Sequence, residues 1–365
     1  MMLLGLVLHT AITYGTVDYG SSWMLKDPNT THVTFDAIVA LIHSFRMQIF
    51  FLIAGFFGAL LFYERSPARM IKNRIQRIGL PFLVFLFVLW PSIKFAFTYT
   101  DLVFSGAPDA WQQAVEDLWS WSSLLPTNTF HLWFLYDLIH VNILFLGFAF
   151  LFIRWKRGAD FIKRNFIWVI KRPLVRLVVL SLLTGLVYYS IDTYSVPSTA
   201  SFIPNYLEVF YYSSFYAFGW VLFKAKEQLD EFKNGDRISL VAGIALFFVH
   251  IIYRDSYTFL QHVVLQAITV WLLIFGIMGC FIRYGSQHSY KMRYISDSSY
   301  WVYLIHLSFV AFFPGLMVDW PIPAVIKLLI VVGASSIICW ISYHYLVRST
   351  FIGKFLNGRK YPRKG

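Results

Sequence analysis

Hydrophobic residues along the chain are gathered into long runs, and short polar stretches separate one run from the next. A helix that crosses the hydrocarbon core of a bilayer needs about 20 apolar residues. Ten runs approach or exceed this length, so the pattern predicts an all-α, polytopic membrane protein with about ten transmembrane helices. The runs lie at about residues 2–16, 35–62, 78–99, 130–153, 174–191, 206–223, 238–252, 258–282, 298–318 and 324–346.

The composition supports this interpretation. The 365 residues are 58% hydrophobic and only 14% charged, with a mean hydropathy of +0.60. A water-soluble domain could not bury that much apolar surface. We therefore expect a lipid bilayer to surround one membrane domain over residues 1–365, because no linker or low-complexity tract interrupts the runs. Cys280 and Cys339 have no metal-ligand or disulfide spacing, so no metal site is expected.

The distribution of charge predicts the topology. The formal net charge is +12, but the basic residues form no continuous patch of the kind that binds nucleic acid, and no nucleic-acid partner is expected. Instead, 26 of the 31 Lys and Arg residues lie in alternate connectors, whereas residues 100–129 contain none. Cytoplasmic loops accumulate Lys and Arg. Both termini are therefore predicted to be cytoplasmic, together with the basic segments 63–77, 154–176, 224–237, 283–293 and 348–365.

The first run is short, at about 15 residues, and begins at Met1 and Met2. It lacks the basic leader and the small-residue cleavage site of a secretory signal, so we interpret it as a membrane span. Its length leads us to expect that the natural start of the protein lies upstream.

Ionisable residues inside the predicted spans are candidates for function, because burying them in lipid costs several kcal/mol. His9 lies in the first run, His43 and Arg46 lie three residues apart in the second, and Asp137 and His140 lie three apart in the fourth. All five are predicted to lie at similar depths in the outer half of the bilayer, as a polar site. The alternative for each is a hydrogen bond that holds two helices together.

Further candidates lie nearer the cytoplasm. His306 is predicted near the middle of the ninth span, and Asp297 at its cytoplasmic start, where a carboxylate could also cap the helix. Lys72, Arg74 and Arg77 precede the third span. Guanidinium groups suit phosphates, although the topology rule alone would place basic residues in this segment.

Four local strings, in matching order and spacing, resemble the membrane acyltransferase 3 family. They begin with His-Ser-Phe-Arg, Arg-Ile-Gln-Arg, His-Leu-Trp-Phe and Ile-Ser-Asp-Ser, and they occupy residues 43–57, 74–81, 131–135 and 295–307. The resemblance covers nearly the whole chain, and it is strongest to the type that succinylates osmoregulated periplasmic glucans.

This resemblance implies a ten-helix bundle in the bacterial inner membrane. It implies transfer of an acyl group, succinyl or acetyl, from cytoplasmic acyl-CoA to a hydroxyl of a periplasmic glucan or other extracytoplasmic glycan. His9 would match the catalytic histidine of the family, and Arg74 and Arg77 would match its donor-site pair. The family has an Arg ten residues before that histidine, a position that falls before Met1. The remaining motif positions, with less settled roles, are Arg46, His131, Asp297 and His306.

As a hypothesis, His9 accepts the proton of the glycan hydroxyl while that oxygen attacks the thioester carbonyl. Asp137 would orient the His9 ring, and Arg46 would stabilise the oxyanion or pair with the free carboxylate of a succinyl group. A covalent acyl-histidine intermediate is equally compatible with the sequence.

Other readings stay open. Polar residues within spans also occur in secondary transporters, and the chain could instead be a non-catalytic partner of glycan-synthesis machinery. A homodimer is also open. Trp111, Trp119 and Trp121 could stack on sugar rings, but interfacial tryptophans are common and we favour that explanation.

Overall fold

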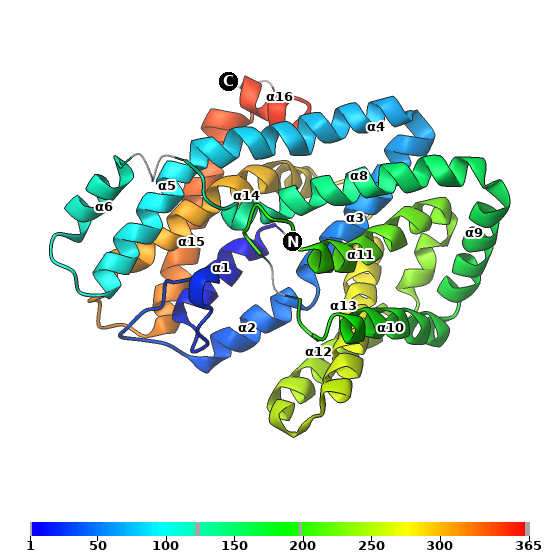
Figure 1. Cartoon of the computed structure of the whole chain (residues 1–365), viewed down its shortest axis with the longest axis horizontal. Coiled ribbons are helices and arrows are strands. Elements are labelled where there is room, and N and C mark those ends of the chain that lie inside the picture. The colour runs from blue at the N-terminus through cyan, green and yellow to red at the C-terminus, as the bar shows by residue number, and fades with distance from the viewer. Residues whose placement is uncertain (1, 121–124, 197–198, 362–365) are drawn as a thin grey trace.

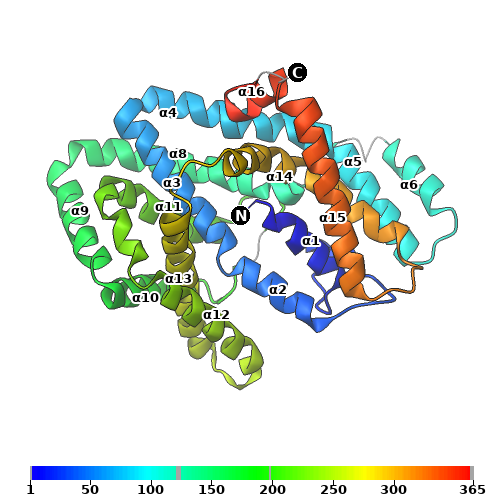
Figure 2. The same ribbon diagram turned by 180° about the vertical axis from the view of Figure 1, so that it is seen from behind.

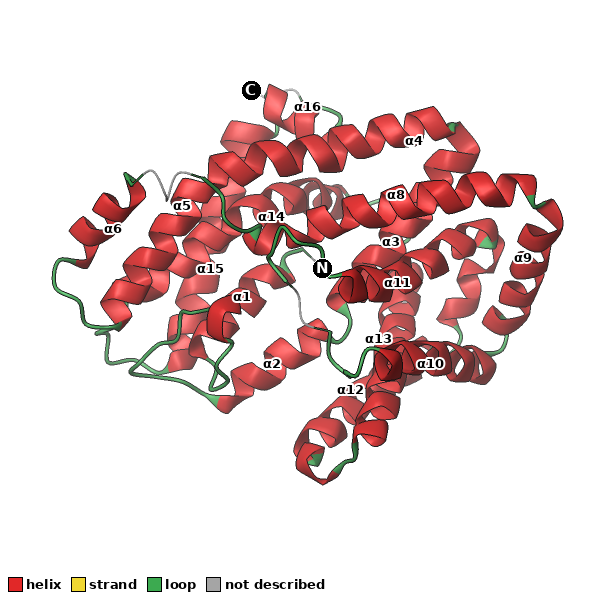
Figure 3. Ribbon diagram, in the orientation of Figure 1, coloured by secondary structure: helices red, strands yellow, loops and turns green. Residues whose placement is uncertain are grey.

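The computed structural model describes residues 2–120, 125–196 and 199–361, and within these residues the chain is built of helices joined by loops (Figure 1, Figure 3). With the labels of Figure 1, the helices are α1 Leu4–Tyr14, α2 Val33–His43, α3 Arg46–Leu60, α4 Pro67–Arg74, α5 Leu80–Phe104, α6 Ala110–Leu118, α8 Trp133–Arg154, α9 Lys156–Ile170, α10 Pro173–Ser190, α11 Tyr206–Lys224, α12 Asp236–Ile252, α13 Phe259–Tyr284, α14 Tyr290–Leu316, α15 Ala324–Ser342 and α16 Phe351–Asn357.

Several of these helices are suited to cross a membrane. In the described parts of the chain, seven helical stretches have the required length and hydropathy, and α12 adds an eighth when joined to the turn before it across a 66° bend. The polytopic, all-helical membrane fold is therefore confirmed. α1 has 11 residues, and α11 has 19 but is rich in tyrosine. The total of ten spans and the orientation of the chain stay predictions.

Large apolar side chains cover the outside of the bundle. On α10, for example, Leu182, Leu183 and Leu186 are all exposed. A soluble monomer seldom exposes such a continuous apolar surface. Helices are suited to this environment because their backbone groups are hydrogen-bonded within the helix and need no water.

Connectors that the sequence assigns to one side of the membrane contact one another. Among the basic connectors, Arg77 donates hydrogen bonds to the carbonyls of Lys354 and Phe355, and Arg283 pairs with Asp236 at 2.7 Å. Connectors of the opposite class also meet: the amide of Asn29 donates to the carbonyl of Val318 at 2.9 Å. These contacts are consistent with the grouping of connectors that the charge predicts.

Three predicted boundaries differ in the structure. α14 begins at Tyr290, with Ser289 as its cap, so Asp297 lies well inside this helix and does not cap it. The basic connectors 63–77 and 154–176 are largely helical, because they contain α4 and α9. The second apolar run is not one helix but is interrupted between α2 and α3, at residues 44–45.

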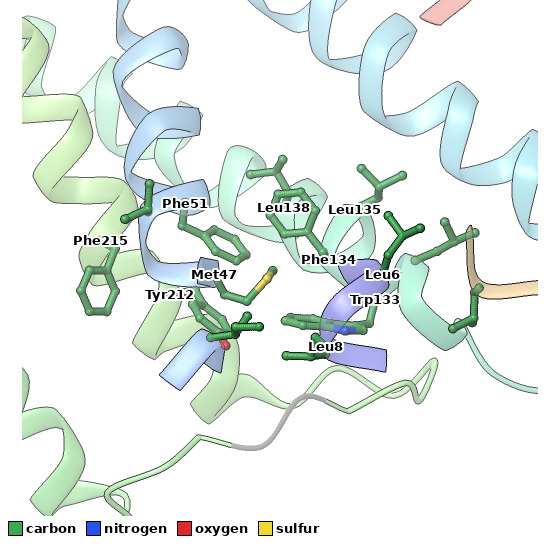
Figure 4. Close-up of a cluster of buried hydrophobic side chains, with 14 of the residues drawn as sticks. Leu6, Leu8, Met47, Phe51, Trp133, Phe134, Leu135, Leu138, Tyr212 and Phe215 are labelled. Carbon is green, nitrogen blue, oxygen red and sulfur yellow. The ribbon is translucent and has the colours of Figure 1, made fainter. Parts of the chain in front are cut away.

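The core lies where α1, α3, α8 and α11 meet (Figure 4). It contains, among others, Leu6, Leu8, Met47, Phe51, Trp133, Phe134, Leu135, Leu138, Tyr212 and Phe215. α3 and α11 approach so closely that a Cβ added at Gly219 would overlap the Leu52 carbonyl. Small residues at crossings permit this kind of contact between membrane helices. Seen from behind, α15 lies beside α1 and α14, so the short α1 is enclosed (Figure 2).

A fully buried ion pair fixes the loop between α1 and α2. The Lys327 ammonium donates to the Asp27 carboxylate at 2.9 Å and to the Val318 carbonyl at 3.1 Å, and both side chains are 0% exposed. Asp27 also accepts hydrogen bonds from the backbone N–H groups of Asn29 and Thr30. The pair joins residues 300 positions apart, so it ties the first outer loop to α15.

We expect Lys327→Met to lower the free energy of unfolding in detergent by about 3–5 kcal/mol, because it leaves the Asp27 charge buried without its partner. Thermal unfolding of the purified protein measures this loss. Adding Asp27→Asn should recover part of it. The control is Lys233→Met, which removes an exposed pair with Asp230 and should cost less than about 1 kcal/mol. Equal losses in the two single variants would contradict the assignment.

Candidate active site

His9 lies on the enclosed helix α1, next to the outer loop. Its ring stacks on Trp23, with centroids 5.1 Å apart and planes 19° from parallel. The Trp23 indole N–H donates to the Thr13 hydroxyl at 3.1 Å, so α1 itself holds the indole in place. His9 is partly exposed, whereas its Nδ1 is buried without a hydrogen-bond partner. The ring is therefore held by packing and leaves its nitrogens available for chemistry.

Two buried histidines stand behind His9, and their hydrogen bonds define their tautomers. His306 lies 5.4 Å from His9 and 5.2 Å from His131, measured between ring centroids. His306 Nδ1 contacts the Tyr303 carbonyl at 2.7 Å, and His131 Nε2 contacts the Leu304 carbonyl at 2.9 Å. A carbonyl can only accept, so these two nitrogens carry the protons. The opposite nitrogens, His306 Nε2 and His131 Nδ1, are buried, unpaired acceptors.

Arg46 is the first residue of α3, directly after the interruption of the second span. Polar side chains stabilise this break: the Ser44 hydroxyl donates to the Ala40 carbonyl, and the Gln48 amide donates to the His43 carbonyl at 3.2 Å. The Arg46 guanidinium is buried, and its Nε has no hydrogen-bond partner. Because the first N–H groups of a helix also lack partners within it, this point of the bundle favours negative charge.

A glycine allows α1 to pack closely against this cluster. A Cβ placed on Gly5 would lie 3.0 Å from His306 Nε2 and 3.6 Å from a terminal nitrogen of Arg46. The absence of a side chain therefore brings α1 against both groups.

Two cavities of very different size meet at His9. The larger has a volume of about 540 Å³, a size typical of ligand sites, and is lined on α1 by Leu8, His9 and Ile12. The smaller, of about 20 Å³, has room for about one water and is lined by Gly5 and His9 of α1 and by Met2, which precedes the helix. Both cavities are also lined by Arg46, His131 and Trp133. The side chains between the cavities thus include His9, Arg46 and His131.

The remaining lining of the larger cavity comes mainly from α5 and from the loops before α2 and α8. Trp23 and Trp90 offer aromatic faces, and Asn128 and Lys94 offer hydrogen-bonding groups, with Lys94 paired to Asp117 at 3.0 Å. Trp111 instead packs against Phe95 at 5.0 Å, outside this cavity. Trp119 does not line the cavity, and Trp121 lies outside the described residues.

The structure does not bring every predicted residue into this cluster. His43 does line the larger cavity, and it is exposed there at the end of α2. Asp137 is buried on α8 one turn beyond Trp133, lines neither cavity at His9, and has Glu208 as its charged neighbour. His140 Nδ1 hydrogen-bonds the carbonyl of Tyr136 on its own helix at 2.9 Å. Asp137 and His140 thus lie apart from His9, although their depths along the sequence were similar.

On the predicted cytoplasmic side, the two motif arginines have separate surroundings. Arg74 is largely buried between helices and donates to the Ala54 carbonyl at 3.0 Å. Arg77 donates to carbonyls at the end of α16, and Lys72 is exposed. The three side chains therefore do not form one cradle in this structure.

Asp297 is held by the C-terminal segment. Its carboxylate accepts hydrogen bonds from the Arg359 guanidinium at 2.9 Å and the Tyr361 hydroxyl at 2.6 Å, and its backbone carbonyl accepts from Asn357. The hydrogen bond and the negative charge of Asp297 raise the pKa of Arg359. Asp297 therefore joins α14 to the segment that follows α16.

Sequence reasoning missed the residues that enclose His9. Trp23 lies in an irregular loop, where no periodicity marks it, and Gly5 lies in a run in which any apolar residue would fit the pattern. Among the residues described by the structure, no group of three His, Cys, Asp or Glu side chains is placed as metal ligands would be. The three histidines therefore do not form a metal centre.

An enclosed histidine between two cavities of a membrane bundle fits the class to which the sequence comparison assigns the chain. The chain belongs to the acyltransferase 3 family, whose description is "Acyltransferase domain" and which matches residues 1–344. It is a multi-pass membrane O-acyltransferase.

Curated relatives agree with this assignment. The proteins named Glucans biosynthesis protein C from Salmonella paratyphi B, Salmonella dublin and Salmonella enteritidis PT4 are each 23% identical to the chain over 331 residues, which cover 86% of this chain and 80% of theirs. No solved structure matches the chain. The family resemblance noted in the sequence is confirmed.

We expect Gly5→Val to reduce acyl transfer at least about tenfold, because the new side chain must displace His306 or Arg46 and the small cavity beside Gly5 has room for only about one water. The matched control is Gly147→Val on α8, where an added Cβ meets no atom within 4 Å. Transfer rates of the two variants, normalised to folded protein, make the comparison. Equal activity of both variants would show that the approach of α1 is not needed.

Proposed function

We propose that the protein transfers an acyl group from cytoplasmic acyl-CoA to a hydroxyl group of an extracytoplasmic glycan, with His9 as general base. One observation supports this most: His9 lies where a large cavity, lined by Trp23, Trp90 and Asn128, meets a small one lined by Met2 and Gly5. A base in this position could receive the acceptor from the larger cavity, and the thioester would approach past Gly5, where the present opening has room for about one water.

The proposed acceptor follows from the lining of the larger cavity. Aromatic rings such as Trp23 and Trp90 can pack on the apolar faces of a sugar, while Asn128 and Lys94 can hydrogen-bond its hydroxyls. The relatives are named for glucan biosynthesis, which favours a glucan as the acceptor. We propose that this glucan is periplasmic and that the protein lies in a bacterial inner membrane.

In the proposed step, the glycan oxygen attacks the thioester carbonyl as its proton passes to His9. A carbon–oxygen ester bond forms and the carbon–sulfur bond breaks. The proton on His9 then passes to the departing thiolate, which leaves as CoA. An acyl-histidine intermediate would use the same groups in two steps.

His306 is the proposed positioning residue for His9, because Asp137 lies elsewhere. The unpaired Nε2 of His306 can accept a hydrogen bond. The unpaired Nδ1 of His9, on the neighbouring ring, is the group that could donate it. Arg46 can stabilise the oxyanion, or it can pair with the free carboxylate if the acyl group is succinyl rather than acetyl.

The donor is proposed to reach the basic segment around α4. Coenzyme A carries phosphates, and Lys72 and Arg69 are exposed cations in this segment. Arg77 is also near the surface, but one of its nitrogens already donates to α16.

We expect His9→Ala to lower acyl transfer by about 10²–10⁴-fold, because general base catalysis is lost, while the protein stays folded in the membrane. Mass spectrometry of a glucan acceptor incubated with acyl-CoA detects the added acyl mass and identifies the group. The matched control is His140→Ala, which changes a histidine outside both cavities and should keep most of the activity. Retained turnover in His9→Ala would exclude this role.

The interrupted span between α2 and α3 is also a feature of secondary transporters, so donor binding needs a direct test. We expect acyl-CoA at 100 times its Kd to stabilise the protein by about 2.7 kcal/mol, measured by thermal unfolding. At the same concentration, an acyl-pantetheine, which lacks the nucleotide phosphates, should stabilise the protein much less. No stabilisation by acyl-CoA would favour a transporter, and stabilisation without product would favour a non-catalytic partner.

A further inference from the structure

A second large cavity lies beside the one that contains His9. It has a volume of about 520 Å³ and extends from α2 to α10, α11, α12 and α13. Tyr19, His43, Arg46 and Trp133 line both large cavities. His9 does not line the second cavity, so the proposed chemistry makes no use of most of this space.

Polar side chains from separate helices form a hydrogen-bonded wall in this second cavity. The Gln48 amide donates to the Tyr211 hydroxyl at 3.1 Å, and Tyr211 shares a 2.7 Å hydrogen bond with Tyr188. The Gln266 amide donates to the Ser44 hydroxyl at 3.4 Å, and Gln266 lines the cavity together with Tyr188 and His250.

The wall continues on the far side of the cavity. His250 Nε2 lies 2.8 Å from His262 Nδ1, and the Tyr194 ring stacks on His262 with centroids 4.4 Å apart. The hydrogen-bonded groups of the wall come from α3, α10, α11, α12 and α13, so several helices have to pack correctly for the wall to form.

This wall is unusual for the interior of a membrane bundle, because polar groups there are costly unless they serve packing or function. Two of its groups are not satisfied by the protein: Gln48 Oε1 and Arg46 Nε are buried and have no partner. Both residues line the cavity. The residues that line the cavity offer hydroxyl, amide and imidazole groups, which could hydrogen-bond a ligand that carries hydroxyl groups.

A comparison within the same molecule argues against a lipid chain as the occupant. A hollow of about 490 Å³ between α10 and α13 is lined almost wholly by apolar side chains, including Leu177, Val178 and Leu182. An acyl chain would fit that lining. The second cavity instead combines hydroxyl, amide and imidazole groups with aromatic faces at Tyr194 and Trp133, a combination that suits a sugar.

We propose that the second cavity is a subsite for a neighbouring sugar unit of an oligosaccharide acceptor, whose reacting unit occupies the cavity at His9. This inference rests on the proposed function, because it takes the acceptor to be a glycan. The shared residues His43 and Trp133 lie where the chain of sugars would pass from one cavity to the other. The enzyme would then recognise at least two linked sugars and would discriminate against free monosaccharides.

The test compares glucose with a β-linked glucose tetrasaccharide as acceptors. We expect Tyr188→Phe and Gln266→Leu each to raise the KM for the tetrasaccharide about 3- to 10-fold, since each removes hydrogen-bonding capacity from the wall. Neither change should alter kcat or the kcat/KM for glucose. The matched control is Tyr189→Phe, which removes an exposed hydroxyl next to Tyr188 and outside the cavity. Losses that are equal for glucose and for the tetrasaccharide would overturn the proposal.

Binding measured without turnover separates this inference from the proposed reaction. In a His9→Ala background, isothermal titration should show tighter binding of the tetrasaccharide than of glucose, and Tyr188→Phe should reduce that difference. If the wild type transfers no acyl group but this difference is found, the proposed reaction fails and the subsite stands. If glucose and the tetrasaccharide bind equally, or Tyr188→Phe leaves the difference unchanged, the subsite is excluded. Tyr188→Phe keeps the ring, so it provides the test even if Gln266→Leu does not fold.

Discussion

The interior of a membrane bundle offers almost no water, and this constraint explains how the site is built. Each buried polar group therefore needs a hydrogen-bond partner from the protein or from a bound ligand. His306 and His131 satisfy one nitrogen each with a backbone carbonyl and leave the other unpaired. The Lys327–Asp27 pair follows the same rule and fixes the loop that carries Trp23. The groups left unpaired around His9 are those that the proposed chemistry requires.

The interruption between α2 and α3 gives this arrangement its shape. In one continuous helix, His43 and Arg46 would lie three residues apart on the same face. Because of the break, α2 ends at His43 and α3 begins at Arg46. Both residues consequently lie at the junction of the two large cavities. The same break exposes helix ends that a straight span would have kept satisfied, and Ser44 and Gln48 compensate for part of this loss.

The long-range features of the fold could be read from the sequence because hydropathy and charge act along whole segments. The helical class and the grouping of connectors at two ends follow from that signal. The site could be read only in part. His9, His43 and Arg46 do come together, but Asp137 and His140 lie further along α8 than Trp133 and line neither cavity at His9, because depths counted along separate runs do not fix how the helices are placed against one another. Asp297 illustrates a second limit. α14 begins seven residues before it, at Tyr290, and because these first residues are largely polar, hydropathy does not reveal where the helix starts.

The contact of Arg77 with α16 limits how an anion can reach this side chain. Guanidinium groups bind phosphate best through two adjacent N–H groups in one plane. In Arg77, one terminal nitrogen is already engaged by the carbonyls of Lys354 and Phe355, which lie outside the region matched by the family. A phosphate must therefore bind through the remaining edge of the group, or the last helix must move aside. The position of α16 therefore limits the directions from which a phosphate can reach Arg77.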